Sequence, residues 1–332
     1  MKTLILAPFS APGLDRLRAQ MDVEYESWLD SRRLHDPEEL AQRLTCGSFS
    51  ILVVEADFVF EETFDQAPCL KFVGVCRGSP TNVDAGAATR HGVIVVNTPG
   101  RNAPAVAELA LGLMMSLARR IPFAHQVVKS GQWEDPVMPY TSLRGMELAG
   151  KTLGIIGLGA IGSELTRRGS ALGMRVLAFD PYVSPAQACG VGATLADLDS
   201  VLQEADFISL HCPTNNSTRG LIDAKRLSLM KPTAYLINTA DAALVDEAAL
   251  SSCLKAGRLA GAGLDVFPSH PVAPDNPLLG LDNVVLTPHI GGATEETVAR
   301  HSDMMTSDIL RFINGERPLH LLNPDVWDKH GR

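Results

Sequence analysis

The sequence predicts an α/β fold made of two doubly wound parallel-sheet domains. Short runs of β-branched residues alternate with helical patterns along the whole chain, an order typical of parallel sheets. The length of 332 residues suits two domains better than one. A connection at 130–148, rich in glycine, proline and polar residues, follows the first series of strands and helices and precedes the second.

The first series contains four apolar runs with the length and composition of strands. We expect these strands at 3–8, 50–56, 70–76 and 92–99. We expect helices between them at 36–44 and 82–92. The following segment, 102–121, has a helical pattern with apolar residues nearly all round. A helix of this kind is buried on several sides, so we expect it between domains or at a subunit contact.

The second series begins at Lys151 and contains six further strand patterns. We expect these strands at 151–159, 174–181, 205–213, 233–240, 259–267 and 283–289. Helical patterns separate them, and a long amphipathic helix is expected at 295–316. The two halves therefore share an architecture, although no sequence repeat links them.

Charge and hydropathy argue against two classes of partner. The net charge is −9 and no cluster of Lys and Arg stands out, which argues against a nucleic-acid surface. No apolar run approaches the ~20 residues of a membrane span. The opening "MKTLILAPFS" carries no cleavage signature, so we interpret it as a first strand and turn.

The six cysteines form no CxxC pair, and several lie in apolar runs such as "KFVGVC" and "ISLHCP". We expect them to be small buried side chains of a protein in a reducing compartment, the cytoplasm.

The passage "TLGIIGLGAIGSELTRRGSALGMRVLAFDPY" predicts a dinucleotide site. Gly157, Gly159 and Gly162 form G-x-G-x-x-G directly after an apolar strand. The first glycine permits a tight turn, the second lets a pyrophosphate approach, and the third lets the helix pack closely on the strand. Asp180 ends the next strand, where a carboxylate binds ribose hydroxyls and favours NAD over NADP. The alternative is a glycine-rich turn in a domain that binds no nucleotide.

Motifs along almost the entire chain resemble one family. They include "VVNTPGRNAPAVAELALGLMM", "GLGAIG", "SLHCPTNNSTRGLID", "LVDEAAL", "GAGLDVF" and "LTPHIGGAT". On these motifs the chain resembles the D-isomer-specific 2-hydroxyacid dehydrogenases. The resemblance implies a Rossmann NAD-binding domain at 102–289, inserted into a flavodoxin-like substrate domain made of 1–101 and 290–332. It also implies an active site in the cleft between them and a homodimer with the helix near Asn102 at the contact.

The resemblance also implies three catalytic side chains, of which this chain retains one. The family's His, which exchanges a proton with the substrate carbonyl as hydride moves, matches His289 in "TPHIGG". The alternative for this residue is a buried strand-end histidine bonded to backbone. The family's Arg, which binds the substrate carboxylate, is replaced by Asp241, and the family's Glu, which pairs with the His, is replaced by His270.

Both replacements change the chemistry expected at the site. Arg forms a bidentate pair with a carboxylate, whereas Asp241 repels one. At ~4 Å and an effective dielectric near 20, a charge pair is worth about 4 kcal/mol, so an ordinary 2-oxo acid held in the usual way is disfavoured. His270 cannot stabilise an imidazolium as a carboxylate does, and two neighbouring imidazoles resist double protonation. Asp241, His270 and His289 are therefore candidates for an acid–base site whose charges differ from those of the family.

Other positions carry over from the family as cofactor or substrate contacts. The resemblance places Thr239 and Asp265 at the nicotinamide and Pro213 over the adenine, although Asp265 also suits a strand-end cap. The predicted cofactor-binding residues are Gly157, Gly159, Ala160, Ile161, Gly162, Asp180, Pro213, Thr218, Thr239 and Asp265. The predicted substrate-binding residues are Arg77, Gly78 and Arg101. For both arginines the alternative is a salt bridge within the protein.

Three functions fit these residues, and the first is the leading hypothesis. It is an NAD-dependent oxidoreductase that transfers hydride to or from an atypical hydroxy or oxo substrate: a phosphonate, a neutral compound, or one whose carboxylate lies elsewhere. The second is a redox-neutral enzyme that holds NAD while Asp241, His270 and His289 perform acid–base work. The third is an NAD(H)-binding sensor without catalysis. A metal held by the same three residues is a minor variant, since nothing in their spacing fixes ligand geometry and the family uses none there. Deliberate mutation of an ordinary dehydrogenase would leave the same pattern.

Overall fold

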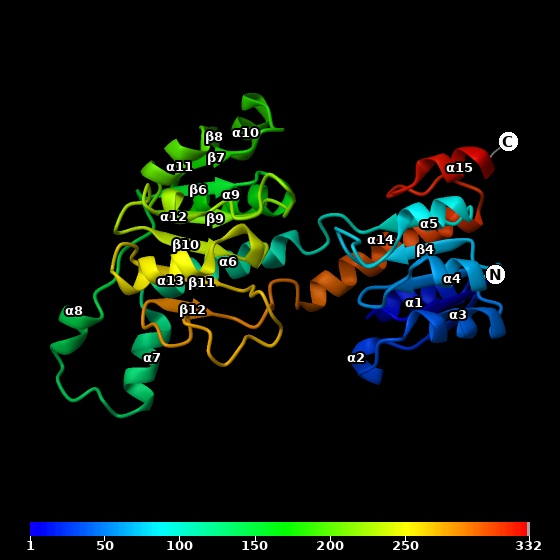
Figure 1. Ribbon diagram of the computed structural model, residues 1–332, viewed down its shortest axis with the longest axis horizontal. Coiled ribbons are helices and arrows are strands. Elements are labelled where there is room, and N and C mark those ends of the chain that lie inside the picture. The colour runs from blue at the N-terminus through cyan, green and yellow to red at the C-terminus, as the bar shows by residue number, and fades with distance from the viewer. Residues whose placement is uncertain (331–332) are drawn as a thin grey trace. The chain divides into compact units, whose positions relative to one another are not determined.

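The computed structural model describes residues 1–330 and divides into two compact units (Figure 1). Unit 1 consists of Met1–Arg101 together with Thr294–Arg332, and unit 2 of Asn102–Ala293. The chain therefore leaves unit 1 once, builds unit 2, and returns. The return falls at 293–294 rather than at the expected 289–290. Residues 290 and 291 stay with unit 2 because Asp265 of that unit accepts hydrogen bonds from their backbone N–H groups.

Unit 1 is built on a five-stranded parallel sheet with the order β2-β1-β3-β4-β5, which is the flavodoxin-like doubly wound order. Its strands are β1 (Lys2–Ile5), β2 (Asp22–Tyr25), β3 (Ile51–Val54), β4 (Phe72–Val75) and β5 (Ile94–Asn97). Its helices are α1 (Ala11–Arg18), α2 (Trp28–Ser31), α3 (Pro37–Cys46), α4 (Glu61–Gln66), α5 (Ala85–Arg90), α14 (Glu295–Ile313) and α15 (Pro324–His330).

Two apolar layers cover the faces of this sheet. Side chains of α3, α4 and α5 pack on one face, and those of α1, α14 and α15 on the other. Helix α14 approaches β4 so closely that a Cβ at Gly74 would collide with the sulfur of Met305. The C-terminal segment is therefore part of the core of unit 1.

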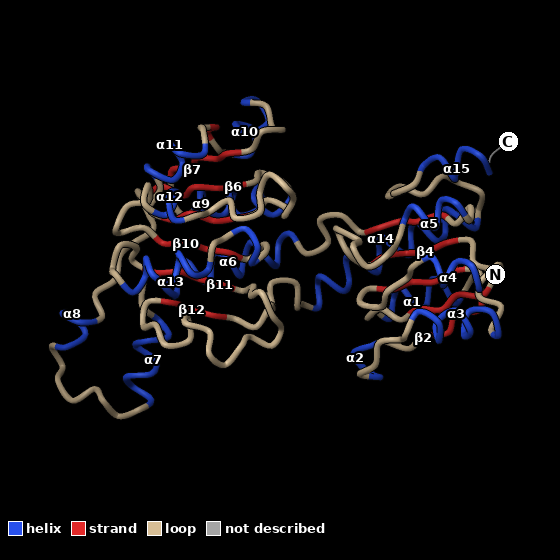
Figure 2. The backbone as a smooth tube through the Cα atoms, viewed as in Figure 1, coloured by secondary structure: helices blue, strands red, loops and turns tan. Residues whose placement is uncertain are grey.

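Unit 2 is built on a seven-stranded parallel sheet with the order β12-β11-β10-β9-β6-β7-β8. Its strands are β6 (Thr152–Ile156), β7 (Arg175–Phe179), β8 (Thr194–Leu195), β9 (Phe207–Leu210), β10 (Tyr235–Asn238), β11 (Gly261–Leu264) and β12 (Val284–Leu286). The strand order reverses beside β6, as in the Rossmann fold, and the crevice at such a reversal is where ligands bind. The tube in Figure 2 shows the strands side by side in the middle of the unit, with helices around them.

Helices cover both faces of this second sheet and leave one segment extending from it. The helices of unit 2 are α6 (Ala103–Ala118), α7 (Ile121–Lys129), α8 (Met138–Ser142), α9 (Ala160–Ala171), α10 (Pro185–Val191), α11 (Leu198–Glu204), α12 (Ala224–Leu227), the 3-10 helix η1 (Ala242–Leu244) and α13 (Glu247–Lys255). Helices α6 and α9 contribute to one apolar layer, and α11, α12 and α13 to the other. Helices α7 and α8 extend away from the sheet of this unit (Figure 1).

Two details differ from the expectations. The predicted helix 102–121 is shorter, because Arg120 takes a left-handed conformation with φ of 53° and separates α6 from α7. All six cysteines are free, but burial holds only for some of them. The exposed ones are Cys46, Cys69 and Cys189. These three lie on helices or in a turn rather than in the apolar strand runs, which explains why the expectation of burial was wrong for them.

No helix within residues 1–330 combines the length and the apolar character needed to cross a membrane.

Candidate active site

The glycine-rich turn after β6 has the geometry of a phosphate cradle. Gly157 has φ of 95°, and a Cβ there would lie 2.6 Å from the backbone nitrogen of Cys212. A Cβ at Gly162 would collide with the carbonyl oxygen of Gly157, so the first turn of α9 packs directly on the loop. A Cβ at Gly159 would meet nothing within 4 Å. Gly157 therefore permits the tight turn and Gly162 the close packing of α9, while the open space beside Gly159 is what the approach of a pyrophosphate would require.

Helix α9 begins at this turn with its backbone donors available. Its N-cap, Gly159, provides no side-chain hydrogen bond, so the N–H groups of the first turn, including those of Ala160 and Ile161, have no side-chain cap. A helix N-terminus of this kind attracts an anion through its N–H groups and its dipole.

A cavity of about 360 Å³ lies beside the turn. Its lining includes Gly157, Gly159, Asp180, Pro213 and Thr218. The Asp180 carboxylate accepts hydrogen bonds from the backbone N–H groups of Leu158 (2.8 Å) and Tyr182 (2.9 Å). Its position at the end of β7 is thereby fixed against the wall of the cavity. A pyrophosphate at the turn with an adenosine in the cavity fits this arrangement.

The loop after β9 forms another wall of the same cavity. The Thr218 hydroxyl donates to the carbonyl oxygen of Pro213 (2.6 Å) and accepts from the N–H of Asn215 (2.8 Å), so it holds the loop closed. His211, also in this lining, was not predicted. Its Nε2 lies 2.8 Å from the Ser209 hydroxyl, and burial lowers the pKa of His211 to about 4. The only sequence signal for His211 was its place at the end of an apolar strand.

Thr239 follows β10, and its buried hydroxyl oxygen has no hydrogen-bond partner among the described residues. A buried hydroxyl normally finds a partner, so an orphan at the carboxyl end of a strand in a nucleotide-binding sheet suits a contact with a bound ligand.

His289 and His270 lie together, as the sequence predicted. Nδ1 of His289 and Nε2 of His270 are 3.0 Å apart, so one ring nitrogen donates a hydrogen bond to the other. Both residues are exposed, and their ring centroids are 5.0 Å apart. Because Nδ1 of His289 is engaged, Nε2 is the nitrogen left to exchange a proton with a substrate.

Asp265 holds the loop that carries His289. One of its carboxylate oxygens accepts from the Thr287 hydroxyl (2.6 Å) and the N–H of Ile290 (2.8 Å), and the other accepts from the N–H of Gly291 (2.8 Å). Asp265 is 1% exposed, and His289 has φ of 56°, a conformation that is uncommon outside glycine. These contacts stabilise the strained position of His289 from both sides. They correspond to the strand-end cap that the sequence left as an alternative for Asp265.

The Asp241 carboxylate accepts a hydrogen bond from a backbone N–H group two residues away and contacts neither histidine. Its Oδ1 accepts from the N–H of Ala243 (2.8 Å) and caps η1. Within residues 1–330 no hydrogen bond or ion pair joins Asp241 to His270 or His289. In the same described part of the chain, no group of three His, Cys, Asp or Glu side chains is placed to hold a metal ion. The structure therefore joins two of the three predicted acid–base residues.

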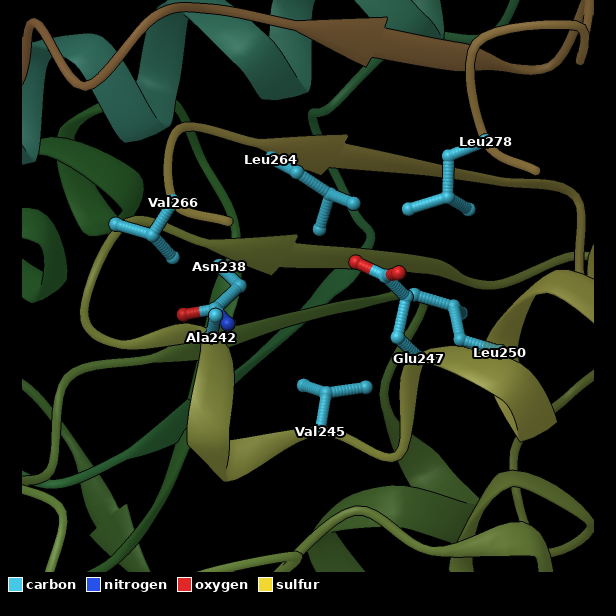
Figure 3. A pocket seen from close by; sticks show the side chains of 8 residues that line it. All are labelled: Asn238, Ala242, Val245, Glu247, Leu250, Leu264, Val266 and Leu278. Atoms are coloured by element: carbon cyan, nitrogen blue, oxygen red, sulfur yellow. The ribbon is translucent and has the colours of Figure 1, made fainter. Parts of the chain in front are cut away.

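A very small cavity lies under the loop that carries Asp241 (Figure 3). It is lined by Asn238, Ala242, Val245, Glu247, Leu250, Leu264, Val266 and Leu278. Its volume of about 10 Å³ is at most that of a single water molecule, so it is not a substrate pocket.

The three predicted substrate residues lie in unit 1, after β4 and β5. The Asn97 side-chain amide donates to the carbonyl oxygen of Gly78 (2.8 Å), which ties the loop after β4 to β5. No described residue forms an ion pair with the Arg77 guanidinium. Arg101, in contrast, forms a largely buried ion pair with Glu55 (2.6 Å) and contacts Nδ1 of His301 (2.7 Å). This ion pair is the alternative to substrate binding that the sequence analysis gave for Arg101.

The fold and the glycine cradle together define an α/β protein of the dinucleotide-binding class. Residues 111–291 match the family model described as "D-isomer specific 2-hydroxyacid dehydrogenase, NAD binding domain". The chain is 40% identical over 326 residues to a glyoxylate reductase of Korarchaeum cryptofilum, covering 98% of this chain and 97% of that protein. The chain belongs to the D-isomer specific 2-hydroxyacid dehydrogenase family, and its cofactor is NAD.

Two further similarities bear on the length and the cofactor. A D-3-phosphoglycerate dehydrogenase of Archaeoglobus fulgidus is 39% identical over 317 residues, which is 95% of this chain but only 58% of that protein. The crystal structure of a D-lactate dehydrogenase from Aquifex aeolicus, complexed with NAD and lactic acid, is similar with a TM-score of 0.79 and 26% identity, covering 97% of this chain and 99% of that one.

Proposed function

We propose that this chain is an NAD-dependent oxidoreductase in which His289 is the acid–base residue for a hydroxy or oxo substrate. The observation that carries the proposal is the paired His289 on a loop fixed by Asp265, in the same unit as the dinucleotide cradle. A bound nicotinamide supplies or accepts the hydride. His289 Nε2 gives a proton to the substrate oxygen in one direction and removes it in the other.

The division of roles follows from the contacts within unit 2. The turn at Gly157, Gly159 and Gly162 would hold the pyrophosphate, and Asp180 the adenosine ribose. The orphaned Thr239 hydroxyl would contact the nicotinamide side of the cofactor. His270 acts through His289, because their shared hydrogen bond selects the nitrogen that stays free.

We further propose that the substrate is not an ordinary 2-oxo acid held through an arginine at position 241. A carboxylate beside Asp241 would be repelled. Arg77 is the cation we propose for substrate binding, since no described residue pairs with it, and Gly78 would contribute backbone contacts. Arg101 is a weaker candidate because Glu55 already neutralises its charge.

The test is NADH oxidation at neutral pH over a panel of 2-oxo acids, phosphonate analogues and neutral hydroxyketones. His289→Gln should lose at least a hundredfold in kcat with unchanged NADH binding, because general acid–base catalysis contributes about 10²–10⁴ in rate. The double variant Asp241→Arg, His270→Glu should gain activity toward 2-oxo acids. If the native chain binds NADH but no compound of the panel leads to NADH oxidation, this proposal is wrong, and the protein is instead a sensor or a redox-neutral enzyme.

A homodimer is the assembly we propose. The apolar face of α6 is already buried within unit 2, so this helix alone offers little free apolar surface. The segment that follows it carries large exposed apolar side chains, namely Ile121, Val128, Trp133, Val137 and Tyr140. Such a group on one segment is typical of a protein contact. Light scattering should give twice the chain mass, and Val128→Asp should shift it toward the monomer.

The compartment we propose is the cytoplasm, which is consistent with six unpaired thiols, three of them exposed.

A further inference from the structure

The loops after β10, β11 and β12 carry no permanent positive charge. No Lys or Arg occurs between Lys231 and Lys255, or between Arg258 and Arg300. These two segments supply the three strands, which are neighbours in the sheet, and the loops at their carboxyl ends. Among the charged or titratable side chains, these three loops therefore carry only carboxylates and imidazoles.

Two carboxylates close to the carboxyl ends of these strands, those of Asp265 and Asp241, differ in how many hydrogen bonds they accept. Asp265 is buried and accepts three hydrogen bonds, which use both of its oxygens. Asp241 is only partly buried, and a single hydrogen bond reaches its side chain, from the N–H of Ala243 to Oδ1. Within residues 1–330, no Lys or Arg forms an ion pair with Asp241. Its negative charge is thus available to a ligand.

Asp241 is also held rigidly in place. The Asn238 side-chain amide donates to the Asp241 carbonyl oxygen (2.8 Å), and the Asn238 side-chain oxygen accepts from the Asp241 N–H (3.3 Å). With the cap on η1, these contacts fix the backbone of Asp241 on both sides. A rigid carboxylate without a cation partner is suited to bind a positively charged group.

The histidine pair indicates which positive group this is. A ketone needs a proton donor as hydride arrives, and a carboxylate partner would keep His289 protonated for that task. The partner of His289 is instead the imidazole of His270, which has no negative charge to offer, and the two rings share one hydrogen bond. A protonated imine already carries its proton, and it would be repelled by an imidazolium.

We propose that the group reduced at this site is a protonated imine, formed in solution from an oxo compound and ammonia or a primary amine with loss of water. Hydride adds to the imine carbon, the C=N π electrons become the lone pair on nitrogen, and the positive charge disappears. In the reverse direction, the ammonium form of the amine first loses its proton to solvent; hydride then leaves the carbon of the neutral amine, and the nitrogen lone pair forms the C=N π bond of the iminium. Asp241 stabilises the iminium in both directions. The inference rests on the proposed NAD-linked hydride transfer, and it changes the substrate class from hydroxy or oxo compounds to imines and amines.

The experiment compares preformed imines with ketones, using the full chain and NADH. The imine probes are 1-pyrroline and 1-pyrroline-2-carboxylate, and the ketone probes are cyclopentanone and pyruvate. We expect kcat/KM for at least one imine to exceed that for both ketones by about a hundredfold. Pyruvate with excess ammonium chloride at pH 8.5 should be reduced faster than pyruvate alone.

Asp241→Asn is the matched variant, because the amide oxygen of Asn can still accept from the N–H of Ala243 and cap η1. It should keep the thermal unfolding temperature and the NADH affinity, yet lose about tenfold or more in kcat/KM for 1-pyrroline. Its kcat/KM for cyclopentanone should fall by less, and that for pyruvate should rise, because Asn does not repel the pyruvate carboxylate. Asp241→Glu should retain part of the imine activity. His270→Glu should shift the preference toward ketones.

The outcomes distinguish a failure of the iminium inference from a failure of the proposed oxidoreductase function. If ketones are reduced and imines are not, or if Asp241→Asn reduces both classes as the native chain does, the iminium inference is wrong and the proposed oxidoreductase stands. If NADH binds but neither class is reduced, the proposed function itself is wrong and the inference fails with it.

Discussion

At single residues of this protein, motifs predicted one contact between neighbouring side chains and left other contacts open. The motif "TPHIGG" predicted His289 as the acid–base residue, and its contact with His270 followed from the family pattern. The sequence could not show that Asp241 turns toward the N–H of Ala243, because that choice depends on the local path of the backbone after β10. Nor could the sequence show that both carboxylate oxygens of Asp265 accept hydrogen bonds from the loop that carries His289.

The first prediction concerns Asp265. Replacing it with Ala removes the acceptor for the Thr287 hydroxyl and for the N–H groups of Ile290 and Gly291. Hydrogen bonds to a charged group are worth about 1.5–3 kcal/mol each, and part of this loss is recovered by solvent, so we expect the free energy of unfolding to fall by about 3 kcal/mol. Urea denaturation measures it.

The same variant should affect His289. Without Asp265 the left-handed conformation of His289 is no longer held, so kcat should fall more than NADH affinity does. Ala262→Gly, a buried change on the same strand, is the control for simple loss of stability. A D265A chain with native stability and native kcat would show that these hydrogen bonds do not position the loop.

The second prediction concerns His211 and acid. Burial lowers the pKa of His211 from 6.5 to about 4 in the folded chain. Above pH 6.5 the ring is neutral in both states and contributes no pH dependence. As the pH falls from 6.5 toward 4, only the unfolded chain takes up the proton, so the free energy of unfolding should fall by about 1 kcal/mol per pH unit.

His211→Gln removes the titrating group and leaves the other histidines in place. Urea denaturation of both chains at pH 7, 6 and 5 isolates the contribution of His211 as the difference in slope. Parallel pH profiles for the two chains would contradict burial of a neutral ring at this position.

At the scale of elements, the sequence predicted every strand that carries an apolar run, including the edge strands β5 and β12, and missed the two edge strands that carry none. Strand β2 reads Asp-Val-Glu-Tyr, and strand β8 has only two residues; each pairs on one side only. Edge strands carry charged side chains and are short, which removes the apolar run by which a strand is recognised. The glycine turn was predictable because each glycine has a separate steric reason.

The third prediction uses two of those glycines as a pair. A Cβ at Gly159 meets nothing, so Gly159→Ala should change the free energy of unfolding by less than about 0.5 kcal/mol. The NAD affinity of this variant should still fall at least tenfold, because the added methyl group lies where the pyrophosphate would approach. Gly162→Ala forces α9 away from Gly157, so it should lose about 1–3 kcal/mol of stability as well as NAD affinity.

Isothermal titration with NAD and urea denaturation of both variants measure the two effects. Tight NAD binding by Gly159→Ala would mean that the cofactor does not approach the turn at this position.

At the scale of the whole molecule, the fold class followed from the alternation of strands and helices. The insertion of one domain into the other was implied by the family resemblance and not by any local pattern. The second boundary was misplaced by four residues, because it depends on hydrogen bonds of Asp265 that no local pattern reveals.

The fourth prediction is that cofactor stabilises the folded chain. A ligand at 100 times its Kd raises the free energy of unfolding by about 2.7 kcal/mol, so NAD should raise the unfolding temperature. NADP should raise it less, since the Asp180 carboxylate at the cavity wall repels a 2′-phosphate. Asp180→Asn keeps one acceptor oxygen but removes the negative charge, so the rises in unfolding temperature with NAD and with NADP should become more similar. Equal shifts with NAD and NADP for the native chain would contradict the role of Asp180.

The return of the chain into unit 1 has a consequence for synthesis on the ribosome. The face of the first sheet that packs against Met305 and Ile309 is covered only in part, by α1, until residues 295–313 have emerged, because those two side chains belong to α14. Unit 2 needs only the continuous stretch from Asn102 to Ala293 and can complete its core earlier. The domain translated first is thus finished last, and during translation its open apolar face is the surface that a chaperone would have to shield.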